Sequence, residues 1–301
     1  PRINAAGRME VDSDDENAAP SGGHSAVYLM VARDEEVASE YGAFIDTCNQ
    51  DRKNIDRSIT QEAHEIIESR PELKNRKSTV IYNPKWMKGI VGIVASRLIE
   101  TYYRPTVVLT MSNGYVTGSA RSVPGFDLYQ AVESCADLLE NFGGHIYAAG
   151  LTMRPENVDE FTRRFNAYVE ENIDPQMLMP QVDIDSELLF SDITPAFRKD
   201  LNRFQPFGPG NTAPVFATYG VSNHGDAKLV GMECEHLRMD LIQRQKPNTK
   251  IQSIAFQQPT HYEWVRSGRP IDVCYQIVEN HYRGTVTTQL RIKDIKPVMN
   301  R

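Results

Sequence analysis

The chain has 301 residues, of which 40% are hydrophobic and 24% charged, and its formal net charge is −7. This length and balance indicate about two globular domains, each with its own core. The acidic sum argues against a protein that coats nucleic acid indiscriminately. No apolar run is long enough to cross a membrane, and the first residues lack the apolar core of a signal peptide.

The cysteines and the first segment indicate where the protein works and how much of it is present. The four cysteines are widely spaced without a CxxC pair, which favours free thiols and a cytoplasmic location. The chain opens on Pro1, in sequence typical of the middle of a domain, so we expect a fragment. Residues 1–10 are predicted to be helical, with Asn4 and Arg8 on one face. The acidic stretch 12–23 predicts a disordered loop, and 25–69 predicts one or two long bridging helices.

Strands and helices alternate over the next hundred residues, which indicates an α/β domain. The helix over 89–100 is apolar almost all round and should be buried. The helix over 127–142 is amphipathic, with Leu128, Ala131 and Cys135 on one side. The predicted strands are 78–82, 106–110 and 115–122, and the predicted helices are 89–100, 127–142 and 158–173.

After Pro180 the pattern changes to short alternating runs separated by Gly, Pro and Asn turns. Such runs predict a small closed β-barrel. The predicted strands are 182–188, 215–221, 237–241, 251–256, 271–278 and 285–295.

A candidate phosphate site lies in the strand over 115–122. A period of two places Ser119 and Arg121 on one face, where a hydroxyl and a guanidinium suit a terminal phosphate. The alternative is an ordinary solvated strand face. The surrounding segment carries a local charge of +4, which can hold phosphates or can be a solvated surface. Its charged residues are Lys85, Lys88, Arg97, Arg104 and Arg121, against Glu100.

A second candidate is Gly143-Gly144-His145. We expect the two glycines to end the preceding helix and to form an amide nest for an anion, with an imidazole beside it. The alternative is a plain helix C-cap with a surface histidine. Two weaker patterns resemble metal sites, Asp183 with Asp185 and Cys234 with His236, but each has too few ligands. We predict no metal bound by this chain.

Several segments, taken together and in order, resemble the bacterial RecJ exonucleases of the DHH family. Ala120 replaces the middle glycine of that family's Gly-Ser-Gly-Arg-Ser motif. The acidic insertion near residues 11–20 also departs from the pattern. The matching segments are Pro1–Met9, Trp86–Leu98, Gly118–Ser122, Phe142–Gly150, Phe204–Phe216, Tyr282–Gly284 and Gln289–Ile295.

The resemblance implies three regions: the end of the catalytic DHH domain with connecting helices (1–76), a DHH-associated α/β domain (77–178) and an OB-like β-barrel (179–301). It implies an exonuclease in DNA repair and recombination, a hydrolase that removes nucleotides from 5′ ends of single-stranded DNA. The Mn²⁺ or Mg²⁺ ions of such enzymes belong to DHH residues upstream of this chain. We therefore expect the fragment alone to be inactive.

The resemblance also implies roles for individual residues. Ser119 and Arg121 would take the 5′-phosphate, and His145 would face the catalytic cleft. The remaining nucleic-acid contacts would be Asn4, Arg8, Arg97, Gly143, Gly144, Tyr282 and Arg283. Expected partners are single-stranded DNA, a single-strand-binding protein or a helicase, and no membrane. Two alternatives stay open: a non-catalytic single-strand-binding scaffold, and a phosphodiesterase for short oligonucleotides or cyclic dinucleotides, against which the barrel argues.

Overall fold

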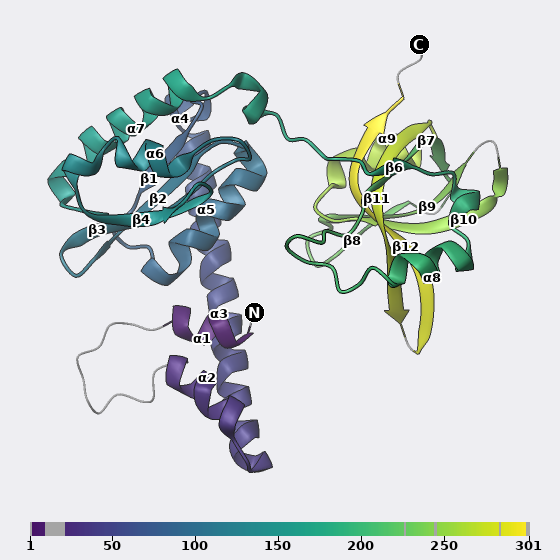
Figure 1. Cartoon of the computed structure of the whole chain (residues 1–301), viewed down its shortest axis with the longest axis horizontal. Coiled ribbons are helices and arrows are strands. Elements are labelled where there is room, and N and C mark those ends of the chain that lie inside the picture. Colours follow the sequence, from purple (N-terminus) through teal and green to yellow (C-terminus); the bar gives the residue numbers. More distant parts are fainter. Residues whose placement is uncertain (1, 10–21, 226, 244–245, 283, 299–301) are drawn as a thin grey trace. The chain divides into compact units, whose positions relative to one another are not determined.

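The computed structural model describes residues 2–9, 22–225, 227–243, 246–282 and 284–298. The chain divides into two compact units, an N-terminal unit (residues 1–180) and a C-terminal unit (residues 181–301) (Figure 1). Each unit has its own hydrophobic core, so each is described by itself.

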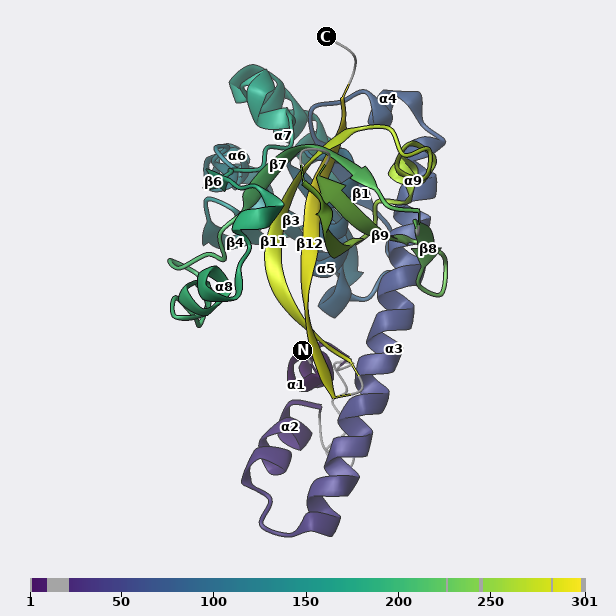
Figure 2. The ribbon, with the colours of Figure 1, turned by 90° about the vertical axis from the view of Figure 1, so that its right-hand side faces the viewer.

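Three helices, α1, α2 and α3, open the N-terminal unit, and α3 is by far the longest (Figure 2). The helical stretch predicted over 25–69 is two helices, separated just before Asp34. The Asp34 carboxylate accepts hydrogen bonds from the N–H groups of Glu36 and Val37 and so caps α3. Most of the loop predicted over 12–23 lies outside the described residues. The bounds are α1 Arg2–Arg8, α2 Gly22–Val31, α3 Glu35–Glu68 and α4 Pro71–Lys74.

A five-stranded sheet forms the rest of this unit, in the order β1-β2-β3-β5-β4. β1 and β2 pair in parallel around the crossover helix α5, and the other neighbours are antiparallel. The sheet has a core on each face. Ile81 and Val108 pack against α5 and α3, while Val107 faces the core built with α6 and α7. The bounds are β1 Thr79–Tyr82, α5 Lys88–Tyr102, β2 Thr106–Ser112, β3 Tyr115–Arg121, α6 Leu128–Glu133, β4 Leu139–His145, β5 Ala148–Met153 and α7 Val158–Asn172.

The prediction of one helix over 127–142 is wrong. α6 ends at Glu133, a 3₁₀ turn follows, and β4 begins at Leu139. Cys135 is buried as the helical period requires, but residues 139–145 pair with β5. Hydrogen bonds to a strand further along the chain outweigh the local helical period. Gly143 and Gly144 therefore lie inside a strand and do not end a helix.

The C-terminal unit is a seven-stranded sheet in the order β6-β7-β11-β12-β10-β9-β8, closed towards a ring by a further β7–β9 pairing. This agrees with the predicted barrel, and β11 and β12 form its longest hairpin (Figure 2). β8, α8 and α9 were not predicted. The bounds are β6 Ser186–Glu187, α8 Pro195–Asn202, β7 Phe216–Asn223, β8 Lys228–Val230, β9 His236–Gln243, β10 Lys246–Ala255, α9 Tyr262–Arg266, β11 Ile271–Tyr282 and β12 Thr285–Pro297.

Candidate nucleic-acid interface

A cleft of about 720 Å³ lies in the N-terminal unit where the end of α1, the start of α5 and the β2–β3 hairpin meet. Arg8, Lys85 and Lys88 line it, and none of the described residues that line it is acidic. The first residues of α5 are also in its wall, so the partial positive charge of that helix end lies here. The cleft is therefore suited to an anion.

Ser119 lines this cleft, and Arg121 lies beside Ser119 on the same strand face, as predicted from the period of their strand, although Arg121 is not itself among the lining residues. Both are half-buried, and a Cβ built on Gly92 of α5 would lie 3.1 Å from Ser119 Oγ and from an Arg121 Nη. The Arg121 guanidinium donates a hydrogen bond to the Ala120 carbonyl oxygen at 2.8 Å. Burial, and then the nearby Arg8 guanidinium, lower the pKa of Arg121 from its ordinary value. Such a crowded pair of cations favours an anion between them.

The open face of the sheet continues from this pair across two more strands. Ser119 is opposite Gly150 and then Gly143, and Arg121 is opposite Ala148 and then His145. Residues opposite one another point to the same face. A Cβ on Gly143 would meet nothing within 4 Å, so this part of the surface is bare backbone.

His145 is on that open face and is exposed. It lines a separate shallow hollow of about 380 Å³ with Gly144, Asp127 and Tyr129. Packing alone explains why position 144 is glycine, because a Cβ there would lie 2.2 Å from the Ala148 carbonyl oxygen. The close approach of β4 and β5 therefore requires glycine at this position.

Asn4 and Arg8 are both exposed on α1, one turn apart. Arg8 reaches the cleft because α1 ends directly against α5: a Cβ on Gly89 would lie 2.0 Å from the Arg8 carbonyl oxygen. A side chain at position 89 would separate the two helices. Asn4 does not line the cleft.

Two arginines of the predicted basic segment have internal partners. Arg97 forms a bidentate ion pair with buried Asp56 of α3. Its Nε donates to Asp56 Oδ1 at 3.0 Å, and its Nη2 donates to Asp56 Oδ2 at 3.0 Å. Arg104 is buried and donates to Thr79 Oγ1 and to carbonyl oxygens of residues 73, 74 and 76. Arg104 is therefore no part of a basic surface, because the sequence shows its charge but not its burial. A contact between Arg97 and nucleic acid stays a prediction.

The C-terminal unit presents a second basic surface that the sequence did not indicate. Lys228, Arg238, Ile254 and Arg291 are successive partners across β8, β9, β10 and β12, so their side chains share one face. Phe256 is two residues beyond Ile254 and is 43% exposed. We call these five residues the barrel face.

Phe256 is held between two neighbours. The Arg291 guanidinium carbon lies 5.4 Å from the centre of its ring, and the His236 ring meets its edge with the ring centres 4.9 Å apart. The signal available in the sequence was the alternation of polar and apolar residues in 289–293, which places Arg291 on the polar side of its strand. Two of the predicted nucleic-acid contacts lie at the end of this hairpin: Tyr282 ends β11 but its side chain is not described, and Arg283 lies outside the described residues.

The described residues do not fit a catalytic metal, because none of them form a group of three or more His, Cys, Asp or Glu side chains that could hold one. Asp185 accepts a hydrogen bond from the Val215 N–H at 2.8 Å, which joins β6 to β7. His236 Nε2 is 3.5 Å from Glu235 Oε1 and next to Phe256. The four cysteines are free, as predicted. Among the described helices, none combines the length and apolar character that a membrane span requires.

Two family models match the chain, the DHHA1 domain over residues 75–171 and the RecJ OB domain over residues 184–294. A Bacillus subtilis protein named single-stranded-DNA-specific exonuclease RecJ is 31% identical over 297 residues, which are 98% of this chain and 36% of that protein. The chain belongs to the RecJ family. The Escherichia coli K12 RecJ exonuclease is 29% identical over 99% of this chain and 50% of that protein.

The fold is shared with solved RecJ structures. A crystal structure of Thermus thermophilus RecJ in complex with Mg²⁺ matches with a TM-score of 0.75 and 23% identity, over 99% of this chain and 42% of that one. A second structure of the same protein is in complex with Mn²⁺ and has the same TM-score. The chain thus spans half or less of these relatives, and it has the DHHA1 and OB domains in the expected order.

Proposed function

We propose that this chain binds the substrate of a single-stranded-DNA-specific exonuclease that degrades DNA from its 5′ end. The observation that carries the proposal is the pair Ser119 and Arg121, set beside a cleft whose described lining residues include cations and no acid. A 5′-terminal phosphate carries more negative charge than an internal phosphodiester. The pair is therefore a receptor for the end of the strand.

The bare backbone of the sheet supports a path for the first nucleotides. Gly150 and Gly143 follow Ser119 across the sheet without side chains that would keep a sugar or phosphate away. His145 and Gly144 are at the far edge of this path, where they would line the side that faces the scissile bond. Arg8, with Asn4 one turn away, would contact the backbone near it.

The metal ions in this proposal come from residues other than those described here. The Mg²⁺ and Mn²⁺ complexes of the Thermus protein support metal use by the whole enzyme. This chain contributes capture and orientation of the strand. The chain alone should therefore release no mononucleotides from single-stranded DNA when Mn²⁺ is supplied.

The barrel face would hold the rest of the strand. An exposed aromatic ring beside an arginine, on a face with further cations, suits single-stranded nucleic acid, because any base can stack on the ring and the cations neutralise phosphates. The face runs over several strands and offers stacking and charge, which every base and phosphate can use, so it would bind with little sequence preference.

The test is a comparison of ligands on the same protein. We would measure the affinity of the chain for single-stranded DNA, for duplex, and for 5′-phosphorylated against 5′-hydroxyl single strands, over a salt series. The proposal expects single strands to be preferred over duplex, the 5′-phosphate to be preferred over the hydroxyl, and affinity to fall with salt. Equal affinity for the two 5′ ends would contradict the cleft's role, and preferred duplex binding would contradict the whole proposal.

A further inference from the structure

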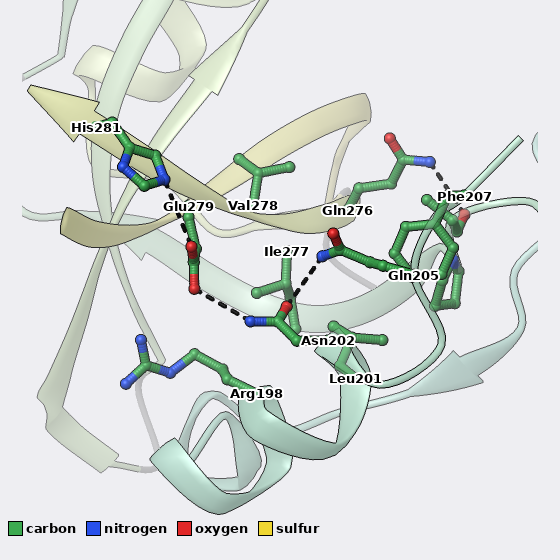
Figure 3. A pocket seen from close by; sticks show the side chains of 12 residues that line it. Arg198, Leu201, Asn202, Gln205, Phe207, Gln276, Ile277, Val278, Glu279 and His281 are labelled. Atoms are coloured by element: carbon green, nitrogen blue, oxygen red, sulfur yellow. Dashed lines mark hydrogen bonds and ion pairs between the residues drawn. The ribbon is translucent and has the colours of Figure 1, made fainter.

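A pocket of about 300 Å³ with a mixed polar and apolar lining is located in the C-terminal unit between α8 and β11 (Figure 3). β7 pairs with β11 only as far as Tyr275, so the later part of β11 has α8 and the following loop beside it. Neither the barrel face nor the cleft of the N-terminal unit includes this pocket.

A continuous line of polar contacts crosses the pocket, two of them hydrogen bonds and the third a His–Glu contact. Gln205 Nε2 donates to Asn202 Oδ1 at 3.1 Å, and Asn202 Nδ2 donates to Glu279 Oε1 at 3.1 Å. His281 Nε2 lies 3.5 Å from the other Glu279 oxygen. Figure 3 shows this line running from the loop, over the end of α8, to β11. The Glu279 carboxylate is thereby held in a fixed place.

The chemistry of the pocket selects against a phosphate and in favour of a base. A carboxylate repels a phosphate but accepts hydrogen bonds from amino and imino groups. Arg198 lines the same pocket, and its Nε is buried with no hydrogen-bond partner in the described structure. A ligand that offers both donors and an acceptor would satisfy both residues. The Watson–Crick edge of guanine has this pattern, with N1–H and N2–H₂ next to O6.

The pocket is also continuous with the barrel face. Gln276, in its wall, is the strand partner of Arg291, and Gln276 Nε2 donates to the Ala213 carbonyl oxygen at 3.0 Å. A strand lying along the barrel face can thus turn a base over β11 into the pocket.

We propose that this pocket binds one unpaired base of the DNA strand, with guanine preferred, through Glu279 and Arg198. The inference rests on the proposed function, since it needs a single strand on the C-terminal unit. It adds a position-specific preference to an otherwise sequence-tolerant surface.

The experiment uses the whole chain and four 5′-hydroxyl DNA strands. One contains thymine alone, and in each of the other three some thymines are replaced by guanine, by inosine or by adenine. The guanine strand should bind roughly tenfold more tightly than the thymine strand, the effect of a hydrogen bond to a charged group. Inosine lacks the N2 amino group and should lose part of that gain. Glu279→Gln should abolish the preference for guanine while the thymine strand still binds.

Glu263→Gln is the matched control, since it removes one exposed carboxylate from α9 of the same unit. It should change binding of all strands equally. Equal affinity of the wild type for all four strands would overturn the pocket and leave the proposed function standing. A guanine preference that survives Glu279→Gln would also overturn the assignment. If the wild type bound none of the single strands, both proposals would be overturned.

Discussion

The two candidate surfaces hold their positive charges in different ways. In the N-terminal unit the cations lie at helix ends and on one strand. The backbone of α1 meets α5 at Gly89, and the Arg121 side chain lies beside Gly92. On the barrel face the cations lie on three strands, and Lys228 and Arg291 are exposed. The half-buried cation of the first surface is Arg121, which has Ser119 as its neighbour, whereas the other cations of that surface, Arg8, Lys85 and Lys88, are exposed.

This difference predicts two kinds of binding. A partly buried guanidinium with a fixed neighbour can select one group by its shape and charge. Exposed cations around an aromatic ring contribute affinity that depends on salt and hardly on sequence. The cleft should therefore decide which end of the strand is bound, and the barrel face should decide how tightly any strand is held.

The first prediction would break the claim that the close packing of β4 against β5 requires glycine at position 144. Gly144→Ala should lower the free energy of unfolding of the N-terminal unit by about 1–3 kcal/mol, because the new Cβ would overlap backbone atoms of β5. The neighbouring Gly143→Ala is the matched control and should stay within about 0.5 kcal/mol, since nothing lies within 4 Å. Both can be measured by denaturation in a Trp264→Phe background, where fluorescence reports on buried Trp86. Equal losses would contradict the strand assignment.

The second prediction sharpens the role of the barrel face. Phe256→Ala should weaken binding of every single strand by about 1–3 kcal/mol, the usual value of one stacked base. Arg291→Ala should weaken binding and lower the salt slope by about 1, because one phosphate contact is lost. Arg266→Ala on α9 removes an exposed arginine that is not one of the five barrel-face residues and serves as the control. An effect on 5′-phosphorylated strands alone would contradict the claim that the barrel face holds any strand while the cleft recognises its end.

The third and smallest prediction concerns pH and the contact of α3 with α5. Burial lowers the pKa of His64, whose Nδ1 is 3.2 Å from the Tyr102 hydroxyl. The unfolded chain then binds a proton more readily than the folded one. Stability should fall as pH drops below 6.5, the ordinary value, and His64 should contribute no pH dependence above it. His64→Gln should flatten this part of the unfolding profile, and an unchanged profile would contradict the assignment.

The sequence predicted those parts of the molecule that depend on local patterns. The strand period put Ser119 and Arg121 on one face, and the structure agrees. The same kind of reasoning failed at residues 139–145, because the partner strand of that segment lies later in the chain. It also counted Arg104 as a surface charge, although carbonyl oxygens around it hold the guanidinium in the interior.

The barrel face shows most clearly what local reasoning misses. Lys228, Arg238 and Arg291 come from three separate strands, and only the register of those strands brings them into one row. Phe256 follows the end of β10, and only the fold shows that Arg291 and His236 lie beside its ring. No spacing in the sequence relates these residues, so their juxtaposition appears only in the fold.

The most direct test of the account is the dependence of the 5′-phosphate preference on Arg121. The affinities of the chain for 5′-phosphorylated and 5′-hydroxyl strands of one sequence would be measured for wild type, Arg121→Lys and Arg121→Ala. The ratio of the two affinities cancels the general attraction between the protein and DNA. We predict a wild-type ratio of roughly tenfold or more, the effect of a charge-assisted hydrogen bond, with little of it retained in either variant. A ratio that survives Arg121→Ala, or variants that weaken both ligands equally, would contradict the central claim that this cleft recognises the end of the strand.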